Sequence, residues 1–174
     1  MKTLLLTLSC LLILNCGTSK TEKPVKIKSF QTDELTVSYP NTWVKFGGLG
    51  YIYLKPKLLY QKEVEDGNYI LLNKSTLQLK DFDNDIEKAL NNYAPILSRN
   101  QTEKYFTLIK IESDSIFVYK IVSTIKYNFR PDTFKRIEFC YKEKNVVKFY
   151  TYQMQEDLFN LYLEDAVLII NSIK

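Results

Sequence analysis

The chain has 174 residues, of which 45% are hydrophobic, and this length suits a single domain with its own core once an N-terminal targeting segment is set aside. Its formal net charge is +4, but bases and acids are interspersed and form no stripe that could follow a phosphate backbone, so no nucleic-acid partner is expected. The chain contains no histidine, which removes the commonest general base and the usual nitrogen ligand of zinc, so we expect no enzyme, no metal and no cofactor.

The first segment is basic and then apolar. Lys2 precedes a leucine-rich run that ends at Leu14, and the first acidic residue is Glu22. This is the layout of a secretory signal. The run is also shorter than the roughly 20 apolar residues that a transmembrane helix needs. We therefore predict that residues 1–15 are a cleaved signal peptide.

The apolar run ends in the letters ILNCG at residues 13–17. They resemble the lipobox of bacterial lipoproteins, with Asn15 where Ala, Gly or Ser is usual. The resemblance implies cleavage between Asn15 and Cys16, diacylglycerol on the Cys16 thiol, and an acyl chain such as palmitate on the freed amine. Cys10 is a rival, but too few residues precede it for a basic region and a full apolar region.

Two or three acyl chains would tie the protein to a membrane, whereas one chain holds only reversibly. Residues 16–29 are then the lipidated N-terminus and a polar, lysine-rich tether. Gly17 and Thr18 lack the aspartate that retains lipoproteins in the inner membrane of some bacteria. The outer membrane is therefore favoured over the cell membrane, with the domain outside the cytoplasm.

Three strands are predicted after the tether. Residues 34–40 alternate between apolar and polar side chains and end at Pro40, and residues 51–56 and 68–79 are rich in aromatic and branched residues. Between the first two strands, the glycine run at 47–50 permits a tight reversal.

The period then changes to that of a helix over residues 81–100. The residues that recur on one helical face are Phe82, Ile86, Ala89, Leu90, Tyr93 and Leu97. Asp81, Asp83 and Asp85 crowd the start, where the helix dipole favours negative charge. The same spacing opens a calcium loop, but Ile86 and Asn92 stand where that loop needs glycine and glutamate. The start of a helix is the favoured reading.

Four consecutive strands with short connections follow, at 103–112, 115–129, 133–143 and 146–154, and predict an antiparallel meander. In the second strand, one face is predicted to carry Phe117, Tyr119, Ile121, Ile125, Tyr127 and Phe129. The last segment, 156–173, has an apolar stripe at helical spacing. The expected fold class is α+β: a mostly antiparallel sheet of about six to seven strands, covered by two main helices, over residues 30–174.

This order of elements resembles the PsbP-like fold. The motif LTVSYPNTW at 35–43 is similar to the family's opening, and residues 149–174 resemble its last strand and closing helix. The fold is shared by an extrinsic photosystem subunit, a Ran-binding nuclear import factor and many bacterial lipoproteins. The resemblance implies a scaffolding or binding module, although one fold hosts many functions.

Four other residues have alternative roles. Trp43 is expected in the core, with a partner-facing anchor as the alternative. Cys140 is expected to be a buried, unpaired thiol, with a reactive one as the alternative. Tyr150 and Tyr152 alternate out of phase with Phe149. They form a docking patch if both helices cover one side of the sheet, and are core if each side has a helix.

Three functions remain open at this stage. The first is a non-catalytic protein-interaction or scaffolding module, anchored to membrane lipid through Cys16. The second is a carrier for a small apolar or glycan ligand, which needs a cavity of about 300 Å³ or more. The third is an enzyme using carboxylate or lysine chemistry, but no pair of titratable residues is apparent in the sequence.

Overall fold

The computed structural model describes residues 25–47, 51–61, 67–93, 101–112, 116–128 and 131–174, without the side chains of 61, 73–75 and 101–106. Asn15, Cys16 and most of the expected tether lie outside this range. The described residues form strands, three α-helices and one 3₁₀ turn, η1. In chain order these are β1 Ile27–Gln31, β2 Thr36–Pro40, β3 Trp43–Phe46, β4 Ile52–Pro56, α1 Lys57–Gln61, β5 Tyr69–Gln78, η1 Leu79–Phe82, α2 Ile86–Asn91, β6 Gln101–Lys110, β7 Phe117–Tyr127, β8 Thr133–Glu143, β9 Val146–Gln155 and α3 Glu156–Asn171.

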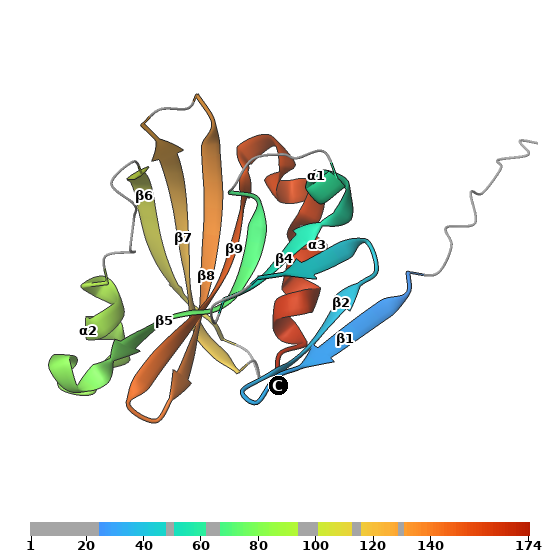
Figure 1. Cartoon of the computed structure of the whole chain (residues 1–174). Helices are drawn as coiled ribbons and strands as arrows, with labels where there is room; N and C mark the ends of the chain where they lie inside the picture. Colours follow the sequence, from blue (N-terminus) through green and yellow to red (C-terminus); the bar gives the residue numbers. More distant parts are fainter. Residues whose placement is uncertain (1–24, 48–50, 62–66, 94–100, 113–115, 129–130) are drawn as a thin grey trace, which may run out of the picture.

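The predicted α+β class is confirmed. Among the described residues, seven strands form one antiparallel sheet in the order β3-β4-β5-β9-β8-β7-β6, and β1 and β2 form a separate hairpin. The predicted meander is the half of the sheet from β6 to β9. Figure 1 shows α3 along one side of the sheet, next to the β1–β2 hairpin.

Three short elements were missing from the sequence-based prediction. Residues 27–29, assigned to the tether, belong to β1, which pairs with β2 from Ile27 opposite Pro40 to Gln31 opposite Thr36. Trp43–Phe46 forms β3 at the edge of the sheet, and Lys57–Gln61 forms α1. Each is only four or five residues long, too short for a hydrophobic period to be recognised.

The helix predicted over 81–100 is shorter and starts later. The α-helix α2 spans Ile86–Asn91, and residues 94–100 lie outside the described range. Asp83 and Asn84 have φ of 57° and 61°, a left-handed conformation that separates η1 from α2. Asp85 then caps α2, because its carboxylate accepts hydrogen bonds from the backbone N–H groups of Glu87 and Lys88.

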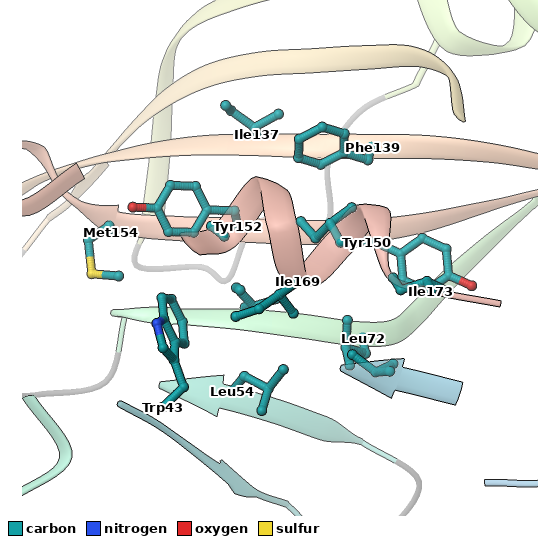
Figure 2. Packing of buried hydrophobic residues seen from close by; sticks show 14 of the residues in the cluster. Trp43, Leu54, Leu72, Ile137, Phe139, Tyr150, Tyr152, Met154, Ile169 and Ile173 are labelled. Atoms are coloured by element: carbon teal, nitrogen blue, oxygen red, sulfur yellow. The ribbon is translucent and has the colours of Figure 1, made fainter. Parts of the chain in front are cut away.

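One helix covers each side of the sheet. On the α3 face, a large cluster joins α3 to the sheet and the β1–β2 hairpin (Figure 2); among its members are Val37, Trp43, Leu54, Ile70, Leu72, Ile137, Phe139, Tyr150, Tyr152, Met154, Phe159, Ala166, Ile169, Ile170 and Ile173. On the α2 face, η1 and α2 cover a smaller cluster: Leu79, Ala89, Leu90, Tyr119, Ile121, Cys140, Val147 and Phe149.

Tyr150 and Tyr152 therefore belong to the core. Both are buried beneath α3, and the Tyr152 hydroxyl donates a 2.6 Å hydrogen bond to the carbonyl of Phe159. On the opposite face, Phe149 stacks on Tyr93 with ring centroids 4.4 Å apart. The docking patch considered for these tyrosines is excluded, because both sides of β9 are covered.

The prediction that Phe117 shares one face of β7 with Tyr119 and Ile121 is wrong. The register of β7 against β8 shifts between Phe117 and Tyr119, so the two side chains lie on opposite faces. Tyr119 and Ile121 pack under α2, whereas Phe117 packs under α3. A β-bulge adds one residue to a strand and so reverses its alternation. Phe129 lies outside the described residues.

Candidate functional site

An apolar groove runs between α3 and the outer strands of the sheet. Its volume is about 300 Å³, and we call it the α3 groove. It is lined by Ile111, Phe117, Lys120, Ile137, Phe139, Leu163, Val167 and Asn171. It exists because α3 packs over β9 and β8 and on β2, and leaves the β7 side of that face uncovered.

The floor of the groove comes from the alternation of side chains along β8 and from the β-bulge in β7. Ile137 and Phe139 are two residues apart on β8 and point to the same face, at the β8 side of the cluster in Figure 2. The bulge turns Phe117 onto this face, where its ring lies 5.6 Å from that of Phe139 and 5.7 Å from that of Tyr150. Phe117 thus contacts two aromatic rings, and such contacts stabilise the floor beyond the area they bury.

The wall of the groove that α3 forms consists of residues four positions apart. Leu163, Val167 and Asn171 are four residues apart and so lie in one row along α3. Leu163 and Val167 are half-buried, whereas Ala166 and Ile170, which neighbour this row, are fully buried against the sheet. The row therefore lies at the edge of the apolar stripe, between the buried face of α3 and its exposed face.

Two polar groups line the groove. Lys120, on β7 opposite Phe139, is half-buried, and its ammonium group makes no ion pair or hydrogen bond with any residue that the structure describes. Asn171 is exposed near the end of α3, and its side-chain amide likewise has no hydrogen-bond partner among the described residues. The groove therefore combines apolar walls with two hydrogen-bond donors that have no acceptor in the described part of the chain.

A second polar group of residues lies on the other face of the sheet. Arg136 is only 4% exposed, and its Nε and Nη2 donate to Oε1 of Gln153 at 2.9 and 2.6 Å. The Gln153 amide donates in turn to the carbonyl of Gly67 at 2.9 Å. Burial raises the pKa of nearby Tyr69 to about 12, against the opposing charge of Arg136. These bonds tie β8, β9 and the start of β5 together, which is a structural role.

The sequence-predicted residues fall in separate places. Trp43 is 1% exposed, and its Nε1 donates to Oδ2 of Asp165 on α3 at 2.8 Å, so the prediction that it belongs to the core is confirmed. Cys140 is a buried, free thiol whose pKa is raised by burial, which confirms the expected buried, unpaired thiol. Neither residue lines the α3 groove. Of the groove residues, Phe117 was predicted on the same face as Tyr119, whereas the structure places it on the opposite face.

The acidic cluster lies at the start of α2. Asp85 is the cap of α2, and Asp83 pairs with Lys88 at 2.6 Å on the surface. Within the described ranges, no three acidic, histidine or cysteine side chains are grouped so that they could hold a metal ion. The reading of the cluster as a helix start is confirmed, although α2 begins only after Asp85.

None of the helices in the described part of the chain is both long and apolar enough to span a bilayer.

Comparison with known proteins shows a likeness in structure. No protein-family model and no curated protein sequence matches the chain. Its structure is similar to the solution structure of the cyanobacterial PsbP, CyanoP, from Synechocystis sp. PCC 6803. The match has a TM-score of 0.47 and 9% sequence identity, and covers 91% of this chain and 98% of CyanoP. The likeness concerns the course of the backbone alone.

Proposed function

We propose that the protein is a non-catalytic binding module that is held at a bacterial envelope membrane by lipid on Cys16 and binds its target in the α3 groove. The observation that carries the proposal is the groove itself. It is already open, apolar in most of its lining, and about 300 Å³ in volume, the lower bound for small-molecule sites. The groove favours the carrier of a small apolar ligand over the protein-scaffolding function.

A protein partner is the second candidate, and a different surface favours it. Aromatic rings gather at the β3–β4 edge of the sheet: Phe46 stacks on Tyr53 at 5.3 Å and lies 5.8 Å from Tyr60. Tyr51 and Tyr60 are 44% and 52% exposed. Exposed tyrosines provide a large contact area at low entropic cost, which suits a protein interface.

The anchor rests on the sequence alone. Residues 17–26 separate Cys16 from β1, a length that reaches at most about 35 Å. Lipid on Cys16 would therefore keep the start of β1 within about that distance of the membrane surface.

The anchor is tested by acyl labelling. Full-length chains are expressed in bacteria supplied with radioactive palmitate, and the label on the purified protein is measured. The wild type and the Cys10→Ser variant should be labelled equally, and Cys16→Ser should carry no label, because its hydroxyl cannot form the thioether. Label that persists on Cys16→Ser, or disappears only from Cys10→Ser, would contradict the proposal.

Ligand binding in the α3 groove is tested with a photoreactive probe and with a variant whose larger side chain fills the groove. The full-length protein in phosphatidylcholine nanodiscs is exposed to a long-chain alcohol bearing a photoreactive diazirine, and labelled peptides are identified by mass spectrometry. We expect labels on the β7 and β8 peptides, reduced several-fold by Val167→Trp, since an indole fills much of a cavity of this size.

Leu168→Trp is the matched control, because Leu168 is the next residue on α3 and is 65% exposed. It should leave the labels on β7 and β8 unchanged. Equal labelling in both variants would refute the groove as the binding site. If a crosslinked protein partner were retained by Val167→Trp, the aromatic edge of β3 and β4 would be the better candidate.

A further inference from the structure

The lysine in the α3 groove indicates which apolar ligand the groove would take. This inference rests on the proposed function, since it concerns the same groove. Lys120 is half-buried among Phe117, Ile137 and Phe139, and its ammonium group has no acidic partner in the described part of the chain. A cation in partly apolar surroundings is costly unless it is paired, so its pairing with an incoming anion is favourable.

Two other half-buried lysines of the same sheet have acidic partners, unlike Lys120. Lys135 pairs with Glu156 at 3.1 Å, and Lys148 pairs with Glu143 at 2.7 Å. Glu112 and Glu164 each follow a residue that lines the groove, yet both are exposed and neither lines it nor pairs with Lys120. Among the residues that the structure describes, the charge lining the groove is therefore positive and has no acidic partner.

A second donor lies in the opposite wall. The amide of Asn171 also lines the groove and has no hydrogen-bond partner among the described residues. Ammonium and amide together can donate to the oxygens of one carboxylate or phosphate, and charge-assisted hydrogen bonds of this kind are about twice as strong as neutral ones. The rest of the lining is apolar: Ile111, Phe117, Ile137, Phe139, Leu163 and Val167.

We propose that the α3 groove binds a single-chain anionic amphiphile, with the apolar chain between α3 and β8 and the anionic head on Lys120 and Asn171. The volume of about 300 Å³ suits one chain of medium length and is too small for a two-chain phospholipid. The anionic head distinguishes this ligand from a neutral apolar molecule and from an apolar peptide segment, neither of which would pair with the lysine.

The experiment compares head groups on one chain. Three diazirine probes, a ten-carbon carboxylate, the matching phosphate and the matching alcohol, are titrated against the full-length protein in phosphatidylcholine nanodiscs. Half-maximal labelling of the β7 and β8 peptides gives the apparent affinity. We expect the anionic probes to bind roughly five- to tenfold more tightly than the alcohol, the effect of one partly buried, charge-assisted contact.

Variants of Lys120 test whether its ammonium group causes the preference for anionic probes. Lys120→Gln should weaken the anionic probes to the level of the alcohol and leave the alcohol unchanged, while Lys120→Arg should keep the preference. Lys126→Gln is the matched control, since Lys126 lies on β7 six residues further, is exposed and does not line the groove. Tighter binding of the phosphate would identify a phosphorylated lipid as the source, and tighter binding of the carboxylate a free fatty acid.

Two results would overturn the proposal, and they differ in meaning. If the alcohol binds as tightly as the anions, and Lys120→Gln changes nothing, the anionic head is refuted while the apolar groove stands. If no probe labels β7 and β8 above the level seen in Val167→Trp, the groove does not bind such chains, and the proposed function fails with it.

Discussion

At the scale of single residues, the cost of a buried charge explains the network around Arg136. Its guanidinium is almost fully buried, and the carbonyl oxygen of Gln153 accepts from two of its nitrogens. Gln153 is itself held in place by the bond from its amide to Gly67. A buried charge needs such partners, because desolvation without them costs several kcal/mol.

Gln153→Leu should therefore destabilise the domain strongly. It leaves the guanidinium of Arg136 without an acceptor for Nε and Nη2, and we expect a loss of about 2–4 kcal/mol in the free energy of unfolding, measured by urea denaturation. The double variant Arg136→Met, Gln153→Leu should recover part of this loss, since it removes the charge as well. A single variant that costs less than about 1 kcal/mol would show that the interaction is not needed.

Another single residue, Trp43, was correctly placed in the core from the sequence, but its partner was not. The large apolar area of the Trp43 indole favoured a place in the core, and the ring is buried. Its bond to Asp165 joins residues 122 positions apart, and its edge-on contact with Tyr162 has a centroid distance of 6.0 Å. No local pattern in the sequence encodes which residue of a distant helix meets an indole.

At the scale of elements, α2 shows how a short helix depends on its first residue. It has six residues, fewer than an isolated helix needs, and so depends on its cap and on the burial of Ala89 and Leu90. The Asp85 carboxylate accepts from two backbone N–H groups at 2.9 and 3.1 Å.

Asp85→Ala should reduce the free energy of unfolding by about 1 kcal/mol, the usual effect of losing an N-cap. Asp81→Ala is the control, because Asp81 is an exposed residue of the same acidic cluster and its carboxylate makes no hydrogen bond or ion pair with a described residue. It should change stability by less than about 0.5 kcal/mol. Equal losses in urea denaturation would show that general charge, rather than the cap, stabilises this turn.

The α3 helix closes the structure through its C-terminal end. Beyond Asn171, the backbone N–H and C=O of Lys174 pair with those of Thr36 at 3.1 and 3.0 Å. The Ser172 hydroxyl donates to the carbonyl of Ser38 and accepts from its N–H, both at 2.9 Å. These bonds hold β2 against the end of α3, and they fix how far the helix covers the sheet, which leaves the β7 side open as the α3 groove.

At the scale of the whole molecule, buried neutral acids should set the upper pH limit of stability. Burial raises the pKa of Tyr69 to about 12 from the usual 10.0, and it also raises the pKa values of Tyr152 and of the Cys140 thiol. In each case the folded state keeps its proton at a pH where the unfolded state loses it. The stabilisation is complete below the unfolded pKa values and is lost as the pH rises towards the folded ones.

The contribution of these groups to the free energy of unfolding should therefore stay nearly constant up to about pH 9. It should fall between about pH 9 and 12. Tyr69→Phe should flatten the part of that fall above about pH 10, because phenylalanine has no proton to lose. Tyr60→Phe is the control, since Tyr60 is 52% exposed. Urea denaturation at successive pH values measures the slopes, and identical slopes for wild type and Tyr69→Phe would contradict this assignment.

The sequence by itself determined the α+β class, the four-strand meander, the closing helix and the burial of Trp43 and Cys140, because these follow from local period and from the apolar character of single residues. Only the tertiary structure decided that one helix lies on each side of the sheet, that a bulge turns Phe117 towards α3, and that Lys120 and Asn171 line one apolar groove. Such a groove is a property of packing: it depends on where α3 stops covering the sheet, and that is set by contacts between residues far apart in the chain.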